Sequence, residues 1–493
     1  MQQSISGRRE FLLRAGQSIA GVSVLAALPG TISAQKTAAQ QASVQPSARA
    51  TKLCLNVRDL GAKGDGASKD TLVVQQALDR AAVLGGGEVL VPAGVYLCGA
   101  LVLRSNTTLH LQEGATLQGS PDIADYPLRQ VRWEGRWIRG YGAFLSAEDA
   151  ESVAITGKGK ILASQAIKGR VVHEDGSPVV HEKPAAIPAP GTNNVAREDI
   201  VRNPALMEFT RCKNLSVSDV WTEGNDMWST HLVYCEGVTF RGVTVRGGAD
   251  GIDVDSCRRV AIDGCNFETH DDCISLKSGR GMEGNLIGMP CEDVQITDCT
   301  FRDAIWACIG IGSETSGGIR NVIVGHCRFL GARTFSIYIK SRPGRGAFIE
   351  DLVFHDLEVS GTGLGFLRIN LLSSGLQDPS PVPGLDGIPR AAHFELRNVH
   401  VQDVPVLVQA EEIHPAKPLD GLKLDNITGT CGKGIRLANV RNAELNKIQV
   451  TGFSGPLLSI CNTTGSGLDG AAPLECPKTP EPIAQPAQPY RLK

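Results

Sequence analysis

The chain has 493 residues, of which 42% are hydrophobic, 5% are aromatic and 56 are glycine. The formal net charge of −3 excludes the strongly basic surface that nucleic-acid binding requires. No apolar run of about eighteen residues occurs in the body of the chain, so the sequence predicts no membrane-spanning helix. Many short runs of Val and Ile are separated by Gly, Asn and Asp, which favours short strands joined by tight turns.

The N-terminus has the pattern of a targeting segment. Arg8 and Arg9 precede an apolar stretch at 18–28 and a small-residue site at 31–34. Residues 1–34 are therefore predicted to be a signal peptide of the twin-arginine type, with an ordinary Sec signal as the alternative. We expect the protein to be exported by a bacterium, to the periplasm or beyond. Removing this segment takes away three arginines and one glutamate, which moves the net charge from −3 to −5.

The rest of the chain divides into three parts. Residues 35–50 are rich in Ala, Gln and Ser and are predicted to be a linker, residues 51–468 to be one folded domain, and residues 469–493 to be a Pro-rich tail. Within the domain, the first helix is predicted over 71–84, with Asp70 as its N-cap. Its apolar face should cover the end of the domain and consists of Val74, Ala77, Leu78 and Ala81.

A repeat organises the domain. Six segments share one pattern of alternating apolar residues, with steps between their first apolar residues of 23, 22, 34, 28 and 30; these residues are Leu215, Val238, Val260, Val294, Val322 and Leu352. A short period with strands but no helix in each repeat predicts an all-β fold, a single-stranded right-handed parallel β-helix with an N-terminal capping helix. A β-propeller needs about forty residues for each blade, so this period is too short for it.

Two Pro-containing insertions, 164–204 and 372–391, interrupt the repeats and are expected to form loops beside a cleft. The fourteen cysteines lie mostly in strand-like runs, where a small apolar side chain packs well, so most are predicted to be buried free thiols. Cys461 and Cys476 are the best candidates for a disulfide.

The repeat also aligns acidic residues. Asp250 follows Val238 by twelve residues, and Asp272 follows Val260 by twelve, so both should occupy the same turn of consecutive coils. Stacked strands lie about 4.7–4.9 Å apart, which would bring these carboxyl groups and that of Asp271 together. Such a cluster is expected to raise the pKa of one carboxyl group while another stays charged, as a general acid and a general base require. The neighbouring acids are expected to be turn and capping residues: Asp253, Asp255, Asp263 and Glu268.

Four segments carry distinctive motifs: GADGIDVDSC, HDDCISLKSG, CIGIGSETSGG and the segment around Ile339 and Lys340. In these motifs the sequence resembles the polygalacturonase family, glycoside hydrolase family 28, and the resemblance covers about residues 55–398. It implies hydrolysis with inversion and without a metal or organic cofactor. In that mechanism Asp271 would protonate the leaving oxygen, while Asp250 and Asp272 activate a water molecule.

Two positions depart from the family pattern. The family's histidine falls at Trp306, which follows Val294 by twelve residues, and the arginine of its Arg-Ile-Lys motif is Tyr338, with Lys340 retained. The two aromatic residues could serve as platforms for a less charged sugar, as in rhamnogalacturonan or another branched pectic glycan. Other residues expected to contact substrate are His270, in partial replacement of the histidine, and Lys277; the cationic contact could extend along the groove through Arg280, Arg320 and Arg342.

The sequence therefore predicts an exported, monomeric glycoside hydrolase that cleaves a pectic polysaccharide and binds neither nucleic acid nor, once the signal is removed, a membrane. Two alternatives belong to other classes. One is a β-helix that only binds carbohydrate, and the other is a polysaccharide lyase of the same fold, which would cleave by β-elimination and normally need calcium.

Overall fold

The computed structural model describes residues 53–173, 177, 179 and 199–492. The predicted signal peptide and linker lie outside this part of the chain. Residues Lys52–Lys493 form one compact unit. In the described ranges, no helix combines the length and the apolar character needed to cross a bilayer.

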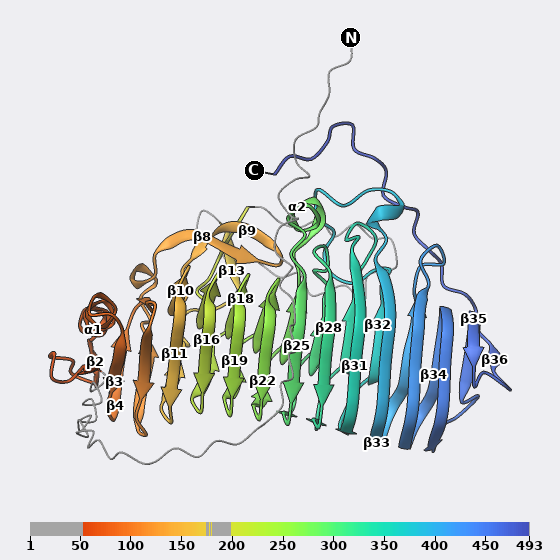
Figure 1. Ribbon diagram of the computed structural model, residues 1–493, viewed down its shortest axis with the longest axis horizontal. Helices are drawn as coiled ribbons and strands as arrows, with labels where there is room; N and C mark the ends of the chain where they lie inside the picture. The colour runs from red at the N-terminus through yellow and green to blue at the C-terminus, as the bar shows by residue number, and fades with distance from the viewer. Residues whose placement is uncertain (1–52, 174–176, 178, 180–198, 493) are drawn as a thin grey trace, which may run out of the picture. The chain divides into compact units, whose positions relative to one another are not determined.

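Most of the described strands form a parallel β-helix, as predicted, in which each strand pairs with its equivalent in the next coil (Figure 1). They stack in three ladders. Ladder A consists of β1 Cys54–Asn56, β3 Gly87–Val91, β6 Thr107–Leu111, β11 Glu151–Gly157, β16 Lys213–Ser218, β19 Glu236–Arg241, β22 Arg258–Asp263, β25 Cys291–Thr297, β28 Ile319–Gly325 and the start of β31 Phe348–Val359. Ladder B consists of β2 Asp65–Lys69, β4 Gly94–Cys98, β7 Ala115–Gly119, β12 Lys160–Leu162, β17 Trp221–Gly224, β20 Thr244–Gly247, β23 Asn266–Glu268, β26 Thr300–Phe301, β29 Arg328–Phe329 and the end of β31.

Ladder C carries the residues that matter most for function. It consists of β5 Leu101–Val102, β10 Leu145–Glu148, β15 Met207–Thr210, β18 Thr230–Val233, β21 Ile252–Asp255, β24 Ile274–Lys277, β27 Ile309–Ile311, β30 Phe335–Lys340 and β32 Gly365–Asn370. The last coils run through longer strands: β33 Arg390–Glu412, β34 Leu419–Thr451 and β35 Leu458–Ser466.

The predicted repeat is the register of ladder A. Leu215 pairs with Val238, and the pairing continues through Val260, Val294, Val322 and Leu352. All six side chains are buried in the central core. Because burying one such side chain stabilises the fold by about 1.5–3 kcal/mol, this row fixes the stacking of the coils. A one-residue slip would turn every member of the row outward.

The N-terminal helix is confirmed and covers the end of the core. α1 spans Thr71–Val83, and its four predicted apolar residues are buried against the first coils. Asp70 stands at the N-cap position, but its carboxylate does not cap the helix. It accepts hydrogen bonds from the backbone N–H groups of Lys63 and Gly64 instead, at 2.6 and 2.8 Å, and so orders the preceding turn.

A second, four-stranded sheet lies beside the coils, near β10 and β18 (Figure 1). Its strands come from loops between the coils: β8 Leu128–Trp133, β9 Arg136–Tyr141, β13 Val171–His173 and β14 Ile200–Arg202. Helix α2, Gly281–Ile287, follows β24, and the short helices η1 Ile123–Asp125 and η2 Leu385–Gly387 lie in other loops. Trp133 of β8 stacks on Trp228, with ring centroids 4.5 Å apart, so this sheet covers the outward face of ladder C at β18.

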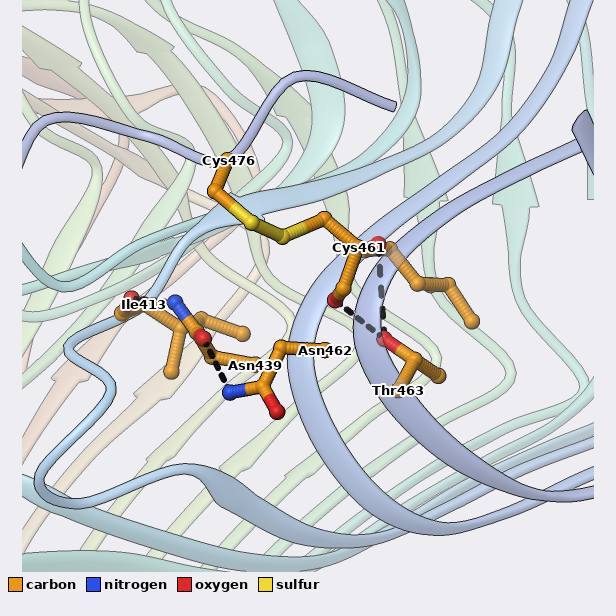
Figure 2. Close-up of a disulfide and its surroundings, with 7 residues drawn as sticks. Ile413, Asn439, Cys461, Asn462, Thr463 and Cys476 are labelled. Carbon is orange, nitrogen blue, oxygen red and sulfur yellow. Dashed lines mark hydrogen bonds between the residues drawn. A yellow bond between two sulfur atoms is a disulfide. The ribbon is translucent and has the colours of Figure 1, made fainter. Parts of the chain in front are cut away.

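The last coil is closed by the predicted disulfide between Cys461 and Cys476 (Figure 2). The Pro-rich tail contains a short strand, β36 Ala472–Pro473, which pairs with β35. The other twelve cysteines are free, and all of them except Cys54 are buried, as expected for side chains that pack in the core.

Candidate active site

Asp250, Asp271 and Asp272 lie at the turn where ladder B passes into ladder C. The pairing of Ile252 with Ile274 sets the two coils in register. The N–H of Gly251 donates to the carbonyl oxygen of Asp272 at 3.0 Å, so Asp250 and Asp272 occupy equivalent positions on adjacent coils. The structure thus brings together the three acids that the sequence singled out.

Asp250 and Asp272 are buried and share one hydroxyl group. Oγ of Ser275 lies 3.2 Å from Oδ2 of Asp250 and 2.9 Å from Oδ2 of Asp272. Each carboxylate also has its own ammonium partner: Lys277 lies 3.0 Å from Oδ2 of Asp250, and Lys340 lies 2.5 Å from Oδ2 of Asp272. Charged partners and hydrogen bonds of this kind hold carboxylates in fixed positions.

The pKa values of two of the acids are displaced in opposite directions. Burial alone would raise the pKa of Asp250, but the charges of Lys277 and Arg170 outweigh it and lower the pKa to about 2. Burial, together with the charges of Asp250 and Asp272, raises the pKa of Asp271 to about 6 despite the opposing effect of Arg170. One carboxyl group is therefore charged where the other can carry a proton, which is the division of roles that general acid and base chemistry needs.

Arg170 is a site residue that the sequence did not reveal. Its Nη2 lies 2.6 Å from Oδ2 of Asp271. Arg170 comes from the 164–204 insertion, one hundred and one positions before Asp271, and directly precedes β13. A lone arginine in an irregular insertion has no periodicity, so only the fold places it at the acids.

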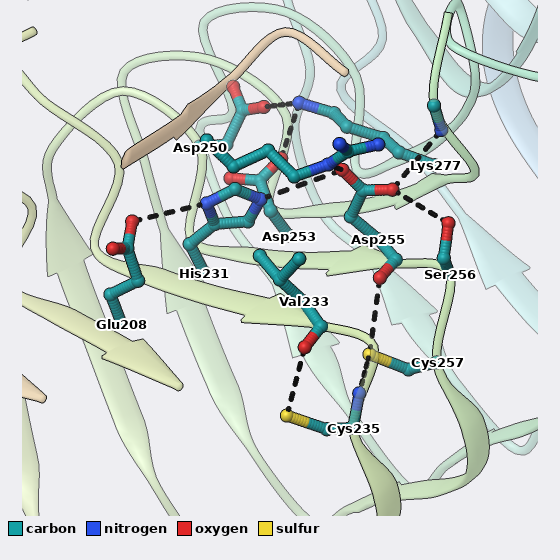
Figure 3. Close-up of polar contacts among 12 residues, drawn as sticks. Glu208, His231, Val233, Cys235, Asp250, Asp253, Asp255, Ser256, Cys257 and Lys277 are labelled. Atoms are coloured by element: carbon teal, nitrogen blue, oxygen red, sulfur yellow. Dashed lines mark hydrogen bonds and ion pairs between the residues drawn. The ribbon is translucent and has the colours of Figure 1, made fainter. Parts of the chain in front are cut away.

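Asp253 and Asp255 are not turn residues, contrary to the prediction. Both point outward from β21 into a buried charged network (Figure 3). Lys277 contacts Asp253, and Nε of Arg132 lies 2.6 Å from Oδ2 of Asp255. The prediction failed because β8 and the loops cover this face of ladder C. On an uncovered strand, the outward side chains would be exposed to water.

The network continues to Glu208 and His231 on the two preceding coils (Figure 3). Nδ1 of His231 lies 3.6 Å from Glu208, and its Nε2 lies 3.9 Å from Asp255. Burial lowers the pKa of His231, although both acids oppose this effect. Arg202 contacts Glu208 and supplies the balancing charge.

The predicted substrate contacts fall into different environments. The side chain of Lys277 is only 6% exposed and serves the buried acids, so it does not face the substrate. Tyr338 is 6% exposed, and its ring lies beneath the guanidinium group of Arg368, 5.2 Å from the ring centroid. Tyr338 therefore presents no open face to a sugar, contrary to the prediction. Lys340 remains partly accessible, with a side-chain exposure of 13%.

Trp306 does not have the phase that the sequence suggested. Ala307 is the residue that stacks on Asp272, because Ile309 pairs with Ile274 and the N–H of Cys273 donates to the carbonyl oxygen of Ala307 at 3.0 Å. The N–H of Ala307 also donates to Oδ1 of Asp272 at 3.1 Å. Ile309, which pairs with Ile274, follows Val294 by fifteen residues, whereas Ile274 follows Val260 by fourteen. In this longer coil, the residue equivalent to Asp272 therefore follows Val294 by thirteen residues, so a count of twelve reaches Trp306 instead of Ala307. Trp306 is 43% exposed and its ring is available to a ligand.

His270 is exposed beside the acids and lines a groove of about 1020 Å³. The groove follows the turns at the end of ladder B on several coils, and Trp221 and Arg333 also line it. The three acids are not among its lining residues, so it borders the acid cluster without containing it.

Three further arginines were expected along the groove. Arg280 is buried and ion-paired with Asp378 at 3.2 Å. Arg320 pairs with Glu292 at 2.6 Å on ladder A and so lies away from the acid cluster. Nη1 of Arg342 donates to the carbonyl oxygen of Gly375 at 2.7 Å, and burial lowers the pKa of this guanidinium group.

Among the described residues, one group has the donor set for a metal ion: His326, His355 and Asp356. It lies at the corner between ladders A and B, away from the acid cluster. His326 and Asp356 belong to a row of left-handed corner residues that also holds Asp298 and Asn398, with φ between 53° and 55°. Asn398 donates to Asp356 at 2.9 Å, so hydrogen bonds along this row account for the cluster.

A parallel β-helix that carries clustered carboxyl groups with opposite pKa shifts has the acid and the base that glycoside hydrolysis requires. Residues 87–367 match the sequence profile of "Glycosyl hydrolases family 28", which is more than half of the chain. The chain therefore belongs to glycosyl hydrolase family 28.

Relatives agree with this assignment. The chain is 26% identical over 387 residues to a "Probable polygalacturonase" of Vitis vinifera, covering 75% of this chain and 73% of that one. It is 26% identical over 405 residues to an "Exo-poly-alpha-D-galacturonosidase" of Dickeya chrysanthemi, covering 73% and 64%. The crystal structure of an exopolygalacturonase from Thermotoga maritima superposes with a TM-score of 0.61 at 26% identity, covering 84% of this chain and 92% of that one.

Proposed function

We propose that this protein hydrolyses the glycosidic bonds of a pectic polysaccharide with inversion, using Asp271 as general acid and Asp250 and Asp272 to activate water. The opposite pKa shifts of Asp271 and Asp250 within one cluster are the observation that carries this assignment. A carboxyl group with a pKa of about 6 can deliver a proton in a mildly acidic medium, where Asp250 stays ionised.

In this mechanism, protonated Asp271 gives its proton to the glycosidic oxygen while the bond to the anomeric carbon breaks. Asp250 and Asp272 accept a proton from the water that attacks the opposite face of the sugar. Ser275 contacts both carboxylates, while Lys277 contacts Asp250 and Lys340 contacts Asp272, so these three residues fix the orientation of the two acids. Asp271 regains a proton from solvent before the next cycle.

Galacturonate is the sugar that the site favours. Arg170 and Lys340 are the partly exposed cations at the acids, and a uronate carboxylate is the group that they would bind. The relatives named above are polygalacturonases by description. Trp306, with its exposed ring, favours a second candidate, a rhamnogalacturonan or another branched pectic glycan, because an aromatic face packs well on a neutral sugar.

We also propose that the enzyme acts at chain ends. The stacked pair Trp133 and Trp228 covers ladder C on the coils before the acids, and His231 beneath it is buried. A polymer would then extend from the site in one direction only. Single sugars or short fragments released from the first minutes of digestion would support this proposal, and a rapid loss of viscosity with long fragments would contradict it.

The remaining proposals concern the whole protein. The twin-arginine signal at 1–34 would direct export of the folded chain to the periplasm or the medium. The linker would then precede domain 51–468 and its Pro-rich tail, 469–493. The enzyme would act as a monomer. Replacing Arg8 and Arg9 with lysine should retain the precursor in the cytoplasm, and normal export of that variant would contradict the signal assignment.

The product decides between the reaction classes. Purified protein is incubated with polygalacturonate and, separately, with rhamnogalacturonan, and both the reducing ends and the ultraviolet absorbance of unsaturated ends are followed. Saturated products from the wild type and none from Asp271→Asn support hydrolysis. Unsaturated products would identify a lyase, and binding without any product on either glycan would identify a carbohydrate-binding protein.

A further inference from the structure

The contact between Arg170 and Asp271 lies at the accessible edge of the acid cluster. The side chain of Arg170 is 33% exposed, and that of Asp271 is 26% exposed. The lysines that pair with Asp250 and Asp272 are much more enclosed. A bound substrate can therefore reach Arg170 without disturbing the two carboxylates that are proposed to activate water.

The backbone that carries Arg170 is fixed, although its side chain is accessible. The side-chain nitrogen Nδ2 of Asn203 donates to the carbonyl oxygens of Lys168 and Gly169, each at 3.0 Å. The backbone N–H of Asn203 donates to the carbonyl oxygen of Arg170 at 2.9 Å, and the N–H of Gly169 donates to Asp226 at 2.7 Å. Only the guanidinium end of Arg170 is free to change partners.

This partner is the wrong one for a general acid that is about to react. An adjacent guanidinium ion favours the ionised form of a carboxyl group, whereas a general acid must hold a proton. The other groups that face Asp271 are the carboxylates of Asp250 and Asp272, which favour the proton, and the more distant Lys340. The charge of Glu134 also helps to raise the pKa of Arg170. If Arg170 moved away from Asp271, the charges of Asp250 and Asp272 would raise the pKa of Asp271 without an opposing guanidinium group.

We propose that Arg170 is a positioning residue that exchanges partners, holding Asp271 in the free enzyme and turning to a carboxylate of the substrate when an anionic sugar binds. Asp271 then takes a proton from solvent and passes it to the glycosidic oxygen as the bond breaks. After the product leaves, ionised Asp271 pairs with Arg170 again. Through this exchange, Asp271 is most fully protonated in complexes with a charged substrate. The proposal rests on the proposed hydrolytic function.

The test compares pH profiles of the full-length wild type and of three variants on an oligogalacturonate and on its fully methyl-esterified form. The high-pH limb of kcat/KM reports the acid in the free enzyme, and that of kcat reports it in the complex. For the wild type on the charged substrate, the limb of kcat should lie at higher pH than that of kcat/KM. On the uncharged ester the two limbs should coincide.

The variants separate this role from a structural one. Arg170→Gln should move the high-pH limb of kcat/KM upward by about one pH unit, because a neighbouring arginine lowers the pKa of an aspartate by about 1–3 units. Arg170→Lys should keep the limb near its wild-type position, and Arg320→Gln, which removes an arginine outside the cluster, should change nothing. Thermal unfolding of each variant checks that it is folded.

Two results would overturn the proposal: coinciding limbs for the wild type on the charged substrate, or an unmoved limb in folded Arg170→Gln. If Arg170→Gln does not fold, Arg170→Lys and the two substrates still decide the question. Absence of hydrolysis by the wild type on either substrate would instead refute the proposed function, so the two failures are distinguishable.

Discussion

Nζ of Lys277 lies 3.0 Å from Oδ2 of Asp250 and also contacts Asp253, so one buried ammonium group serves two buried carboxyl groups. The two acids respond differently. The pKa of Asp250 falls, whereas burial and the charge of Asp250 raise the pKa of Asp253 well above its usual range. Asp253 therefore holds its proton to a higher pH than Asp250 does.

This difference predicts the result of two matched substitutions. Asp253→Asn keeps the shape of the side chain whose pKa is raised and should leave kcat close to that of the wild type. Asp250→Asn removes a charged base and should lower kcat by about 100-fold or more. Steady-state kinetics and thermal unfolding of both variants test this, and equal inactivation of the two would contradict the opposite pKa shifts of Asp250 and Asp253.

Gly310 is expected to accept no side chain. A Cβ atom there would lie 2.2 Å from Oδ2 of Asp272 and 3.1 Å from Nζ of Lys340, so the ion pair would have to separate. Gly310→Ala should leave the β-helix folded but lower kcat/KM by about 100-fold, since a small displacement of a reacting group has an effect of this size. Gly264→Asn is the control, because Gly264 has φ of 60° and open space around it. Wild-type activity in Gly310→Ala would refute the placement of this pair.

Asp271 is expected to lower the free energy of unfolding at neutral pH. Its pKa in the folded protein is about 6, above the ordinary value of an unfolded aspartate, so its favourable contribution is complete below about pH 4 and is lost as the pH rises through 6. Asp271→Asn should therefore match the wild type near pH 4 and exceed its free energy of unfolding above pH 6, by at most about 2–3 kcal/mol. Urea denaturation at both pH values measures this difference. A variant that is less stable than the wild type above pH 6 would contradict the raised pKa.

The disulfide should secure the tail without affecting catalysis. Cys461 and Cys476 join the last coil to the segment after β36, whereas the acids lie at β21 and β24 (Figures 1 and 2). A bridge across fifteen residues contributes about 3 kcal/mol to the closed conformation. Cys461→Ser with Cys476→Ser should be digested faster by carboxypeptidase and keep its kcat. A large loss of kcat in that variant would show that the last coil supports the site.

The sequence predicted those parts of the site that follow the repeat. The row from Leu215 to Leu352 has the period of the coils, and burial of one face enforces that period. Asp250 and Asp272 inherit their alignment from this row. The same count failed for Trp306, because a single extra residue in its coil shifts the phase, and the apolar pattern does not record turn length.

Other parts of the site depend on long-range contacts that leave no local pattern. Arg170 reaches Asp271 from an irregular insertion, and only the packing of that insertion on the coils places it there. Asp253 and Asp255 alternate with buried Val254 as any half-exposed strand would, so their burial under β8 is not visible in the sequence. The cover over ladder C is a tertiary feature, and through Arg132 of β8 it supplies the partner of buried Asp255.

The anomeric form of the first product tests the central claim most directly. In an inverting mechanism, hydrolysis of an α-linked galacturonate polymer by water activated at Asp250 and Asp272 releases the β-anomer first. Proton NMR of a fresh digest of polygalacturonate should show the β-anomer before mutarotation, and Asp271→Asn should yield no signal. Initial appearance of the α-anomer, or undiminished product from Asp271→Asn, would contradict the assignment of these three acids.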